Sequence, residues 1–231
     1  MSKSLTCIIP AHDEAARIAG VLAAALDHPL IDEVIVIDDG STDGTAGVAE
    51  ACGARVIRLA PNRGKSAALA AGLAAAQART GASHVMMLDA DLTGLRAADL
   101  TALIGPVWQG RADVSLSLRG NAPWAWRRIG VDYITGERVL SLSLLAPCAD
   151  ALDALPRFGL EVFLNERIRA SGLTVAIVSW PRVASPSKAR KRGRLAGLRA
   201  DLAMICDMFR TVTPRRALTQ ILFLRGARPK I

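Results

Sequence analysis

The first ninety residues alternate regularly between short β-branched runs and Ala/Leu-rich stretches, and this alternation constrains the fold more than any other feature. The runs predict strands at residues 5–9, 33–37, 55–59 and 84–88, and the stretches between them predict helices at 14–26, 45–52 and 65–79. Strands joined by single helices indicate an α/β fold with a mostly parallel central sheet flanked by helices. In such sheets ligands bind where the carboxyl ends of the strands meet.

The second half of the chain has a weaker pattern. It predicts helices at residues 100–109, 136–145 and 161–170, and strands at 113–118 and 174–180. A polar, basic loop is expected at 181–194, followed by an amphipathic helix at 195–212. Because no repeat or low-complexity linker interrupts the 231 residues, we expect one domain, 1–231, with two halves, 1–95 and 96–181, and a helical tail, 182–231.

The chain lacks the usual sequence signs of export or membrane insertion. No segment approaches the roughly 20 apolar residues that cross a bilayer, and charged residues interrupt the amino terminus before a signal-peptide stretch could form. The four cysteines are scattered without a CxxC pair, so neither a zinc site nor a disulfide framework is indicated. These features predict a cytoplasmic protein.

Positive charge is concentrated in the tail. From residue 182 onward, 13 Lys and Arg residues face only Asp201 and Asp207, a net charge of +11, whereas residues 1–181 carry −3. A basic tail favours a phosphate-bearing partner, either an anionic membrane surface or a phosphorylated acceptor. Nucleic acid is disfavoured, because no aromatic interleaving accompanies the charge. The amphipathic stripe fits packing on the domain itself or on a second copy in a homodimer better than peripheral binding at the inner membrane face.

Polar clusters follow three of the predicted strands at the point where each ends. They are Pro10-Ala11-His12-Asp13-Glu14, Asp38-Asp39-Gly40-Ser41-Thr42-Asp43-Gly44-Thr45 and Asp89-Ala90-Asp91. On a parallel sheet all three reach the same edge, so we expect them to form one site.

The Asp89-Ala90-Asp91 cluster, a DxD motif, has the spacing of a metal site. One carboxylate can meet a divalent cation while the other reaches a metal-bound water or a ribose hydroxyl. Mg²⁺ and Mn²⁺ prefer such oxygen ligands and commonly bridge a carboxylate to substrate phosphates. The alternative is a solvated turn after a strand.

Two further segments indicate nucleotide and phosphate binding. The adjacent acids Asp38 and Asp39 repel each other unless a ligand engages them, and the ring N–H of a base or the hydroxyls of a ribose could do so. The alternative is a turn whose Thr42 or Asp43 caps the next helix. Asn62-Arg63-Gly64-Lys65 precedes a helix start, which favours anions, but it equally fits a simple loop with solvated charges.

The order of these motifs resembles the nucleotide-binding half of family 2 glycosyltransferases. PAHDEA, VIVIDDGSTDGT, APNRGKSAALAAGL and VMMLDADL follow one another over residues 5–95. The resemblance implies a GT-A fold, a UDP- or GDP-sugar as donor, and Mg²⁺ or Mn²⁺ as cofactor. It implies that the nucleoside contacts Pro10, Ala11, Glu14, Asp38 and Asp39, that Lys65 lies near the phosphates, and that Asp89, Ala90 and Asp91 bind metal and donor.

Downstream, the resemblance extends to the acceptor half of bacterial relatives. Gly136-Glu137-Arg138 and Phe158-Gly159-Leu160-Glu161 are similar to segments of glucosyl-3-phosphoglycerate synthases and dolichyl-phosphate sugar transferases. The resemblance places Glu161 as the catalytic base; alternatively it pairs with Arg157 or Arg169. Arg138 binds an acceptor phosphate on one interpretation and pairs with a nearby acid on the other.

The chain departs from the family pattern in one respect. Many GT-A enzymes supply a late His to the metal or diphosphate site, whereas all three histidines here lie in the first half. His28 and His84 are expected to be structural, and His12 is left open. We expect Lys188, Arg190 and Lys191 to hold the diphosphate electrostatically instead.

These observations favour a metal-dependent glycosyltransferase acting on an unknown, phosphorylated or lipid-linked acceptor. Nucleotidyl transfer is a second enzyme class, but the glycine-rich basic signature typical of its amino terminus is replaced here by PAHDEA. The non-enzyme alternative is a degenerate GT-A protein that binds nucleotide sugars or serves as a membrane scaffold without turnover.

Overall fold

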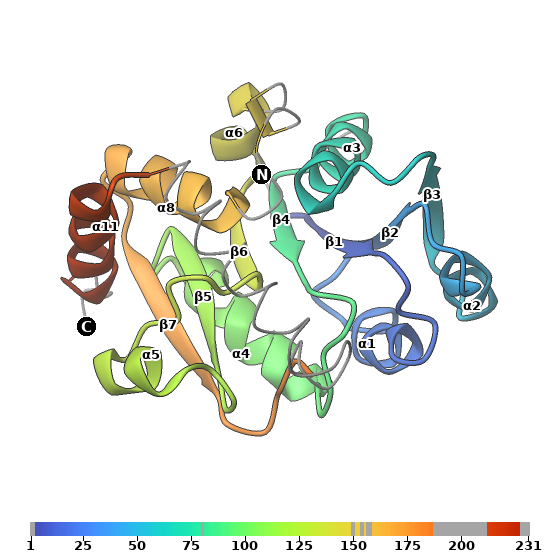
Figure 1. The fold of residues 1–231 in the computed structure, drawn as a ribbon, viewed down its shortest axis with the longest axis horizontal. Helices are drawn as coiled ribbons and strands as arrows, with labels where there is room; N and C mark the ends of the chain where they lie inside the picture. Colours follow the sequence, from blue (N-terminus) through green and yellow to red (C-terminus); the bar gives the residue numbers. More distant parts are fainter. Residues whose placement is uncertain are drawn as a thin grey trace.

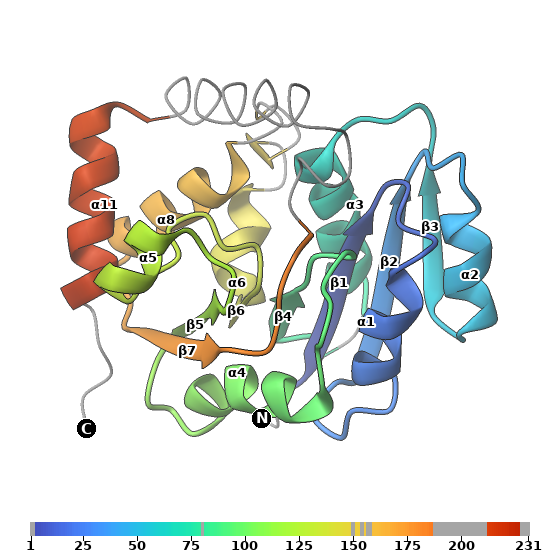
Figure 2. The same ribbon diagram turned by 60° about the horizontal axis from the view of Figure 1, so that its bottom comes forward.

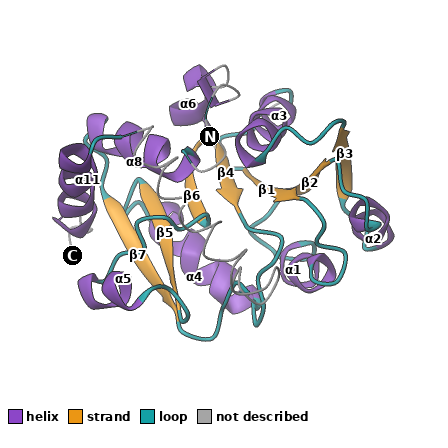
Figure 3. Ribbon diagram, viewed as in Figure 1, coloured by secondary structure: helices purple, strands orange, loops and turns teal. Residues whose placement is uncertain are grey.

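A seven-stranded sheet with helices on both faces forms the centre of the computed structural model, which describes residues 3–79, 81–148, 151–152, 155, 159–186 and 212–226 (Figures 1 and 3). The strands are β1 (Leu5–Ala11), β2 (Glu33–Asp39), β3 (Arg55–Leu59), β4 (His84–Met87), β5 (Val114–Arg119), β6 (Arg138–Ser141) and β7 (Val175–Trp180). The helices are α1 (Ile18–Ala25), α2 (Thr45–Ala51), α3 (Lys65–Gln77), α4 (Ala97–Trp108), α5 (Trp124–Ile129), α6 (Leu142–Leu145), the 3₁₀ turn η1 (Ala146–Cys148), α8 (Leu160–Ala170) and α11 (Pro214–Gly226).

The sheet is mostly parallel, as the sequence predicts. Its strand order is β3-β2-β1-β4-β6-β5-β7, and β6 alone among these strands runs antiparallel to its neighbours. The predicted helix at 136–145 is therefore wrong over its first part, because Arg138–Ser141 is a strand and only Leu142–Leu145 is helical. A short apolar run of this kind has no periodicity that separates a buried strand from a buried helix. Helix α5 was not predicted.

Strand register brings the three polar clusters to one edge. Ala11 of β1 lies opposite Asp38 of β2, and Ile8 lies opposite Met87, two residues before Asp89. The carboxyl ends of β1, β2 and β4 therefore meet, which confirms the predicted convergence.

The sheet divides the hydrophobic core into two layers, visible as helices above and below the strands in Figure 1. One layer packs α3, α6, α8 and α11 against the sheet, with Leu69, Leu73 and Leu160 fully buried. The other packs α1 and α4, with Ile18 and Leu103 fully buried. Because helices cover both faces of the sheet, ligands can reach it only at the ends of the strands.

The tail is described in part. Residues 187–211, which include Lys188, Arg190, Lys191 and most of the predicted helix 195–212, lie outside the described residues. Helix α11 packs on α8, and its Gln220 accepts a hydrogen bond from Tyr133 (2.6 Å) and donates one to Glu166 (2.7 Å). None of the helices described is both long and apolar enough to span a bilayer.

Gly72 sets the distance between α3 and the sheet. A Cβ atom at this position would lie 2.5 Å from Cγ2 of Ile8 and 3.3 Å from Cγ1 of Ile37, both core atoms. We expect Gly72→Ala to lower the free energy of unfolding by about 1–3 kcal/mol through overpacking, measured by urea denaturation. Gly20→Ala in α1, where the added Cβ meets nothing within 4 Å, is the control and should be neutral or slightly stabilising. Equal effects of the two variants would contradict this account.

Candidate active site

Loops after β1 and β2 are tied together into one wall of the site. Asp13 has a left-handed backbone (φ 54°), a conformation that Asp tolerates better than most residues. Its carboxylate accepts a hydrogen bond from the Thr42 amide (2.9 Å), and its own amide donates to the Ser41 hydroxyl (3.0 Å). The Glu14 amide donates to the Thr45 hydroxyl (2.8 Å). These hydrogen bonds therefore hold the loops of the first two polar clusters against each other.

Asp39 holds the loop that precedes α3. Its carboxylate accepts hydrogen bonds from the amides of Arg63 (2.8 Å) and Gly64 (2.7 Å), while its carbonyl accepts one from the Asn62 side chain (2.9 Å). These bonds fix the position from which Lys65 enters the site. Asp39 thus holds the start of α3 while it also lines the cleft.

Asp38 lies beside this wall and is 4% exposed. Its Oδ1 atom is buried without a hydrogen-bond partner among the described residues. A buried acceptor without a donor is rare in folded proteins and costs free energy unless a ligand or water supplies one. Asp38 is not among the residues that line the cleft.

Lys65, at the start of α3, joins the two halves of the chain. Its Nζ atom lies 2.7 Å from Oδ1 of Asp89 and 2.9 Å from Oε1 of Glu161. Burial opposes its charge, but the two carboxylates together raise the pKa of Lys65 above its usual value. Glu161 thus pairs with Lys65; Arg169 pairs with Glu166 instead (2.6 Å), and Arg157 is outside the described residues.

Asp89, after β4, is held between two cations. Burial alone would raise its pKa, but Lys65 and then Arg119, whose Nη1 lies 3.9 Å from Oδ2, lower the pKa of Asp89 to about 2. Gly136 approaches the pair closely, because a Cβ there would lie 2.5 Å from Oδ1 of Asp89 and 2.7 Å from Nζ of Lys65. The carboxylate is therefore ionised and fixed.

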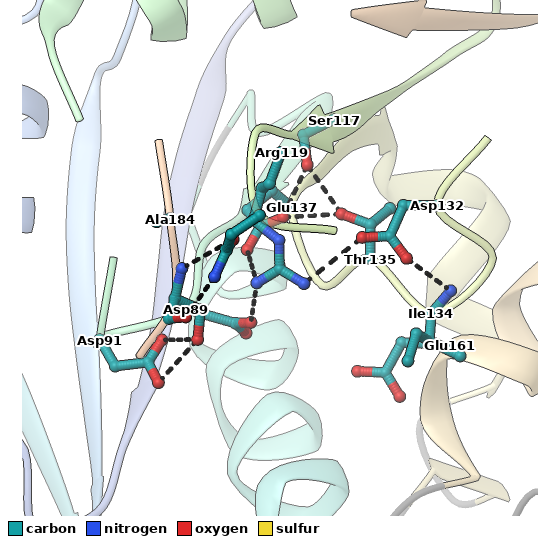
Figure 4. Close-up of polar contacts among 12 residues, drawn as sticks. Asp89, Asp91, Ser117, Arg119, Asp132, Ile134, Thr135, Glu137, Glu161 and Ala184 are labelled. Carbon is teal, nitrogen blue, oxygen red and sulfur yellow. Dashed lines mark hydrogen bonds and ion pairs between the residues drawn. The ribbon is translucent and has the colours of Figure 1, made fainter. Parts of the chain in front are cut away.

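Arg119 also anchors a buried network behind Asp89 (Figure 4). Its guanidinium lies 3.4 Å from carboxylate oxygens of Asp132 and Glu137, which are both fully buried. Hydroxyls of Ser117 and Thr135 each donate to Oε2 of Glu137 at 2.6 Å. Burial raises the pKa of both acids, and the charge of Arg119 opposes that rise.

The sequence analysis missed most of this network. Arg119 ends β5 at the edge of the sheet where Asp89 follows β4, so the rule that found the three polar clusters could have found Arg119 as well. Glu137 appeared only as part of a motif, and no signal in the sequence marked Asp132.

Arg138, the first residue of β6, is fully buried, and it contacts Asn165 of α8. It donates hydrogen bonds to the Asn165 side chain (3.3 Å) and the Thr135 carbonyl, and burial lowers its pKa. Among the described residues its hydrogen bonds therefore go to neutral groups. An acceptor phosphate could reach it only if the surrounding residues moved.

Asp91 accepts a hydrogen bond from the hydroxyl of Ser185. The Ser185 Oγ atom lies 2.9 Å and 3.0 Å from its two carboxylate oxygens. Among the described residues no group of three or more His, Cys, Asp and Glu side chains could hold a metal ion. A Mg²⁺-type site does not need one, since one or two carboxylates and substrate phosphates usually suffice. Asp91, with Asp89 beside it, fits that requirement.

A cleft of about 230 Å³ lies at the carboxyl edge of the sheet. Its lining residues are Pro10, Ala11, His12, Glu14, Asp39, Lys65, Ala68, Asp89, Ala90 and Asp91. His12 thus lies at the cleft, 3.5 Å from Asp13. The structure places His28 and His84 away from it, where His28 bonds Thr101 (2.9 Å) and His84 bonds Ser83 (2.9 Å).

Comparison with known proteins assigns the chain to a family. The model of the family described as "Glycosyl transferase family 2" matches residues 6–147, which is more than half of the chain. The chain belongs to glycosyltransferase family 2. The match covers the three polar clusters, Lys65 and the Arg119 network, but not Glu161.

Curated relatives of this family 2 glycosyltransferase include the 4,4'-diaponeurosporenoate glycosyltransferases of Staphylococcus aureus. The protein of strain bovine RF122 / ET3-1 is 38% identical over 107 residues, and that of strain USA300 is 37% identical. The match covers 44% of the present chain and 28% of the length of these relatives.

Solved structures with the same fold include glucosyl-3-phosphoglycerate synthase from Mycobacterium tuberculosis. Its complex with Mn²⁺, UDP and phosphoglyceric acid has a TM-score of 0.72 and 25% identity, over 99% of this chain and 80% of that one. Its complex with Mg²⁺ and UDP has a TM-score of 0.69 and 24% identity, over 90% and 80%. The predicted GT-A fold is confirmed.

Proposed function

We propose that this family 2 protein transfers a sugar from a nucleotide diphosphate to an acceptor hydroxyl with the help of a divalent cation. The observation that carries the proposal is a single cleft in which Asp39, Lys65, Asp89 and Asp91 meet, with Glu161 joined to it through Lys65. Acids for a nucleoside and a metal, a cation for phosphates and a carboxylate for a base are the groups this reaction needs.

The donor is a UDP-sugar on this proposal. Among the described residues Oδ1 of Asp38 is a buried acceptor without a partner, which suits the ring N–H of a base, and Ala11 of the cleft lining lies opposite Asp38 in the sheet. The preference for UDP over GDP rests on the M. tuberculosis synthase, whose complexes hold UDP.

The cation is Mg²⁺ or Mn²⁺, with Asp91 as its principal protein ligand. Asp89 is engaged by Lys65 and Arg119, so we assign it to orienting Lys65 and to the edge of the metal site. A bound cation would act as a Lewis acid for the departing diphosphate. Lys65 lies where it can exchange its carboxylate partners for phosphate oxygens. Lys188 and Lys191 remain candidates for further diphosphate contacts, although the structure does not describe them.

Glu161 is the proposed base. It is 14% exposed and paired with Lys65, whose Nζ lies 2.9 Å from Oε1 of Glu161. If donor phosphates draw Lys65 away, Glu161 is released from this pair as the donor binds. The proton then goes from the acceptor hydroxyl to Glu161 as the oxygen attacks the sugar.

The acceptor is phosphorylated or lipid-linked on this proposal. Phosphoglyceric acid in the M. tuberculosis complexes supports the first class, and the carotenoid-like acid in the name of the S. aureus relatives supports the second. Exposed apolar residues also favour peripheral binding to an anionic membrane: Trp124 of α5 is 72% exposed, and Leu218 and Leu222 are each 57% exposed on α11, a helix that also carries arginines. Helices α5 and α11 lie at the same end of the molecule in Figures 1 and 2. Flotation with anionic liposomes, lost in Leu218→Ser/Leu222→Ser, tests the membrane proposal; flotation equal to that of the wild type would reject it.

A thermal-shift experiment separates the enzyme from a degenerate scaffold. UDP with Mn²⁺ is expected to raise the melting temperature of the wild type, because a ligand that binds only the folded state stabilises it. Asp91→Ala should lose the part of the shift that depends on Mn²⁺ and keep the unliganded melting temperature. Failure of UDP-, GDP-, ADP- and TDP-sugars to shift the wild type would favour a scaffold without turnover.

A further inference from the structure

The segment from Pro181 to Pro186 is fastened to the loop that carries Asp91. Thr93 and Ala184 form a two-way backbone bridge, with N–O distances of 2.8 Å and 3.0 Å. Side chains at Gly94 and Gly120 would collide with the carbonyl groups of Arg182 and Pro181, so both glycines permit backbone approach that other residues would prevent. The segment is therefore closely fitted to the site.

Asn121 holds the end of this segment from the other side. Its side-chain amide donates to the Ser185 carbonyl (2.6 Å), and its side-chain oxygen accepts a hydrogen bond from the Ser185 amide (3.3 Å). Two bonds of opposite direction fix both the place and the rotation of the Ser185 backbone. The Ser185 side chain therefore starts from a fixed position.

The fixed hydroxyl points at Asp91. It lies at nearly equal distances, 2.9 Å and 3.0 Å, from the two carboxylate oxygens. A hydroxyl has one proton, so at any moment it donates to only one of these two oxygens. Its own lone pairs are the hard oxygen donors that Mg²⁺ and Mn²⁺ accept.

We propose that Ser185, held by Asn121, is a positioning residue that sets the orientation of the Asp91 carboxylate for the divalent cation. The inference rests on the proposed function, since it assigns a helper to the same metal ligand. Many GT-A enzymes supply a histidine to the metal site from the late part of the chain. In this chain, Ser185 of the segment 181–186 would take part in that site instead. Residues that orient metal ligands commonly change metal affinity by roughly 10–100-fold when they are removed.

Mn²⁺ binding in the presence of saturating UDP tests this role directly. The free Mn²⁺ signal in electron paramagnetic resonance gives the affinity without any measurement of turnover. We expect Ser185→Ala and Asn121→Ala each to weaken Mn²⁺ binding by about tenfold. Ser185→Thr, which keeps the hydroxyl, should stay within about threefold of the wild type if the added methyl group is accommodated.

Two controls separate this inference from the proposed function. UDP affinity without metal should be unchanged in Ser185→Ala and Asn121→Ala, because a merely structural defect would lower it as well. If Ser185→Ala and Asn121→Ala both bind Mn²⁺ like the wild type while Asp91→Ala does not, the positioning role is wrong and the proposed function stands. If the wild type itself binds no Mn²⁺ with UDP, the metal-dependent function fails and the inference fails with it.

Discussion

Glutamine in place of Glu161 is expected to reduce sugar transfer by roughly 10²–10⁴-fold, the usual contribution of a general base. The amide keeps the shape of the side chain and its contact with Lys65 but cannot accept the acceptor proton. Binding of UDP and Mn²⁺ should change little, because Glu161 lies outside the set of residues that line the cleft. The measurement is UDP release from UDP-glucose with phosphoglyceric acid, the ligands of the M. tuberculosis synthase, as first substrates.

Glu166→Gln on the same helix is the matched control. Glu166 pairs with Arg169 and accepts a hydrogen bond from Gln220, both remote from the cleft lining. It should lose a little stability and no more than about twofold in turnover, since exposed pairs contribute little. Wild-type turnover in Glu161→Gln would assign the proton to another group.

Methionine in place of Arg119 is expected to lower the free energy of unfolding by about 3–5 kcal/mol, the cost of removing one partner from a buried ion pair. The fully buried carboxyl groups of Asp132 and Glu137 would lose their shared cation. Arg58→Met is the control, because the Arg58–Glu50 pair is 57% and 46% exposed and should contribute no more than about 1 kcal/mol.

The effect of Arg119→Met should also depend on pH, with a defined sign. Burial already raises the pKa of Glu137 and of Asp132, and loss of Arg119 raises both further. An acid whose folded pKa exceeds its unfolded pKa loses stability as pH rises between those values. The deficit of Arg119→Met relative to the wild type should therefore be larger at pH 8 than at pH 5 in urea denaturation. A deficit that grows toward low pH would contradict the network as described.

Local pattern was sufficient for the first half of the fold. Strands β1 to β4 alternate with amphipathic or Ala-rich helices, and their ends carry Pro10, Gly40 and Gly64, so boundaries were predicted within a few residues. Strand β6 was mistaken for part of a helix because Val139 and Leu140 are both fully buried, and burial on both faces removes the alternation that marks a strand.

The site was predictable where its residues follow strands and unpredictable where the contact is long-range. Asp39, Asp89 and Asp91 were found because strand ends meet on a parallel sheet. The Lys65–Glu161 pair joins residues 96 positions apart, and the Asp91–Ser185 contact spans 94. Pairings of this kind are set by how the halves pack, which a single sequence does not encode in any local pattern.

The short helix after β5 has a consequence for how such proteins diverge. Helix α5 lies in the chain between Arg119, which ends β5, and Asp132, yet none of its own residues is fully buried. Apart from Trp126, which packs against the core, substitutions in α5 cost little core packing. A lineage can therefore replace most of this exposed stretch without disturbing the residues that line the cleft.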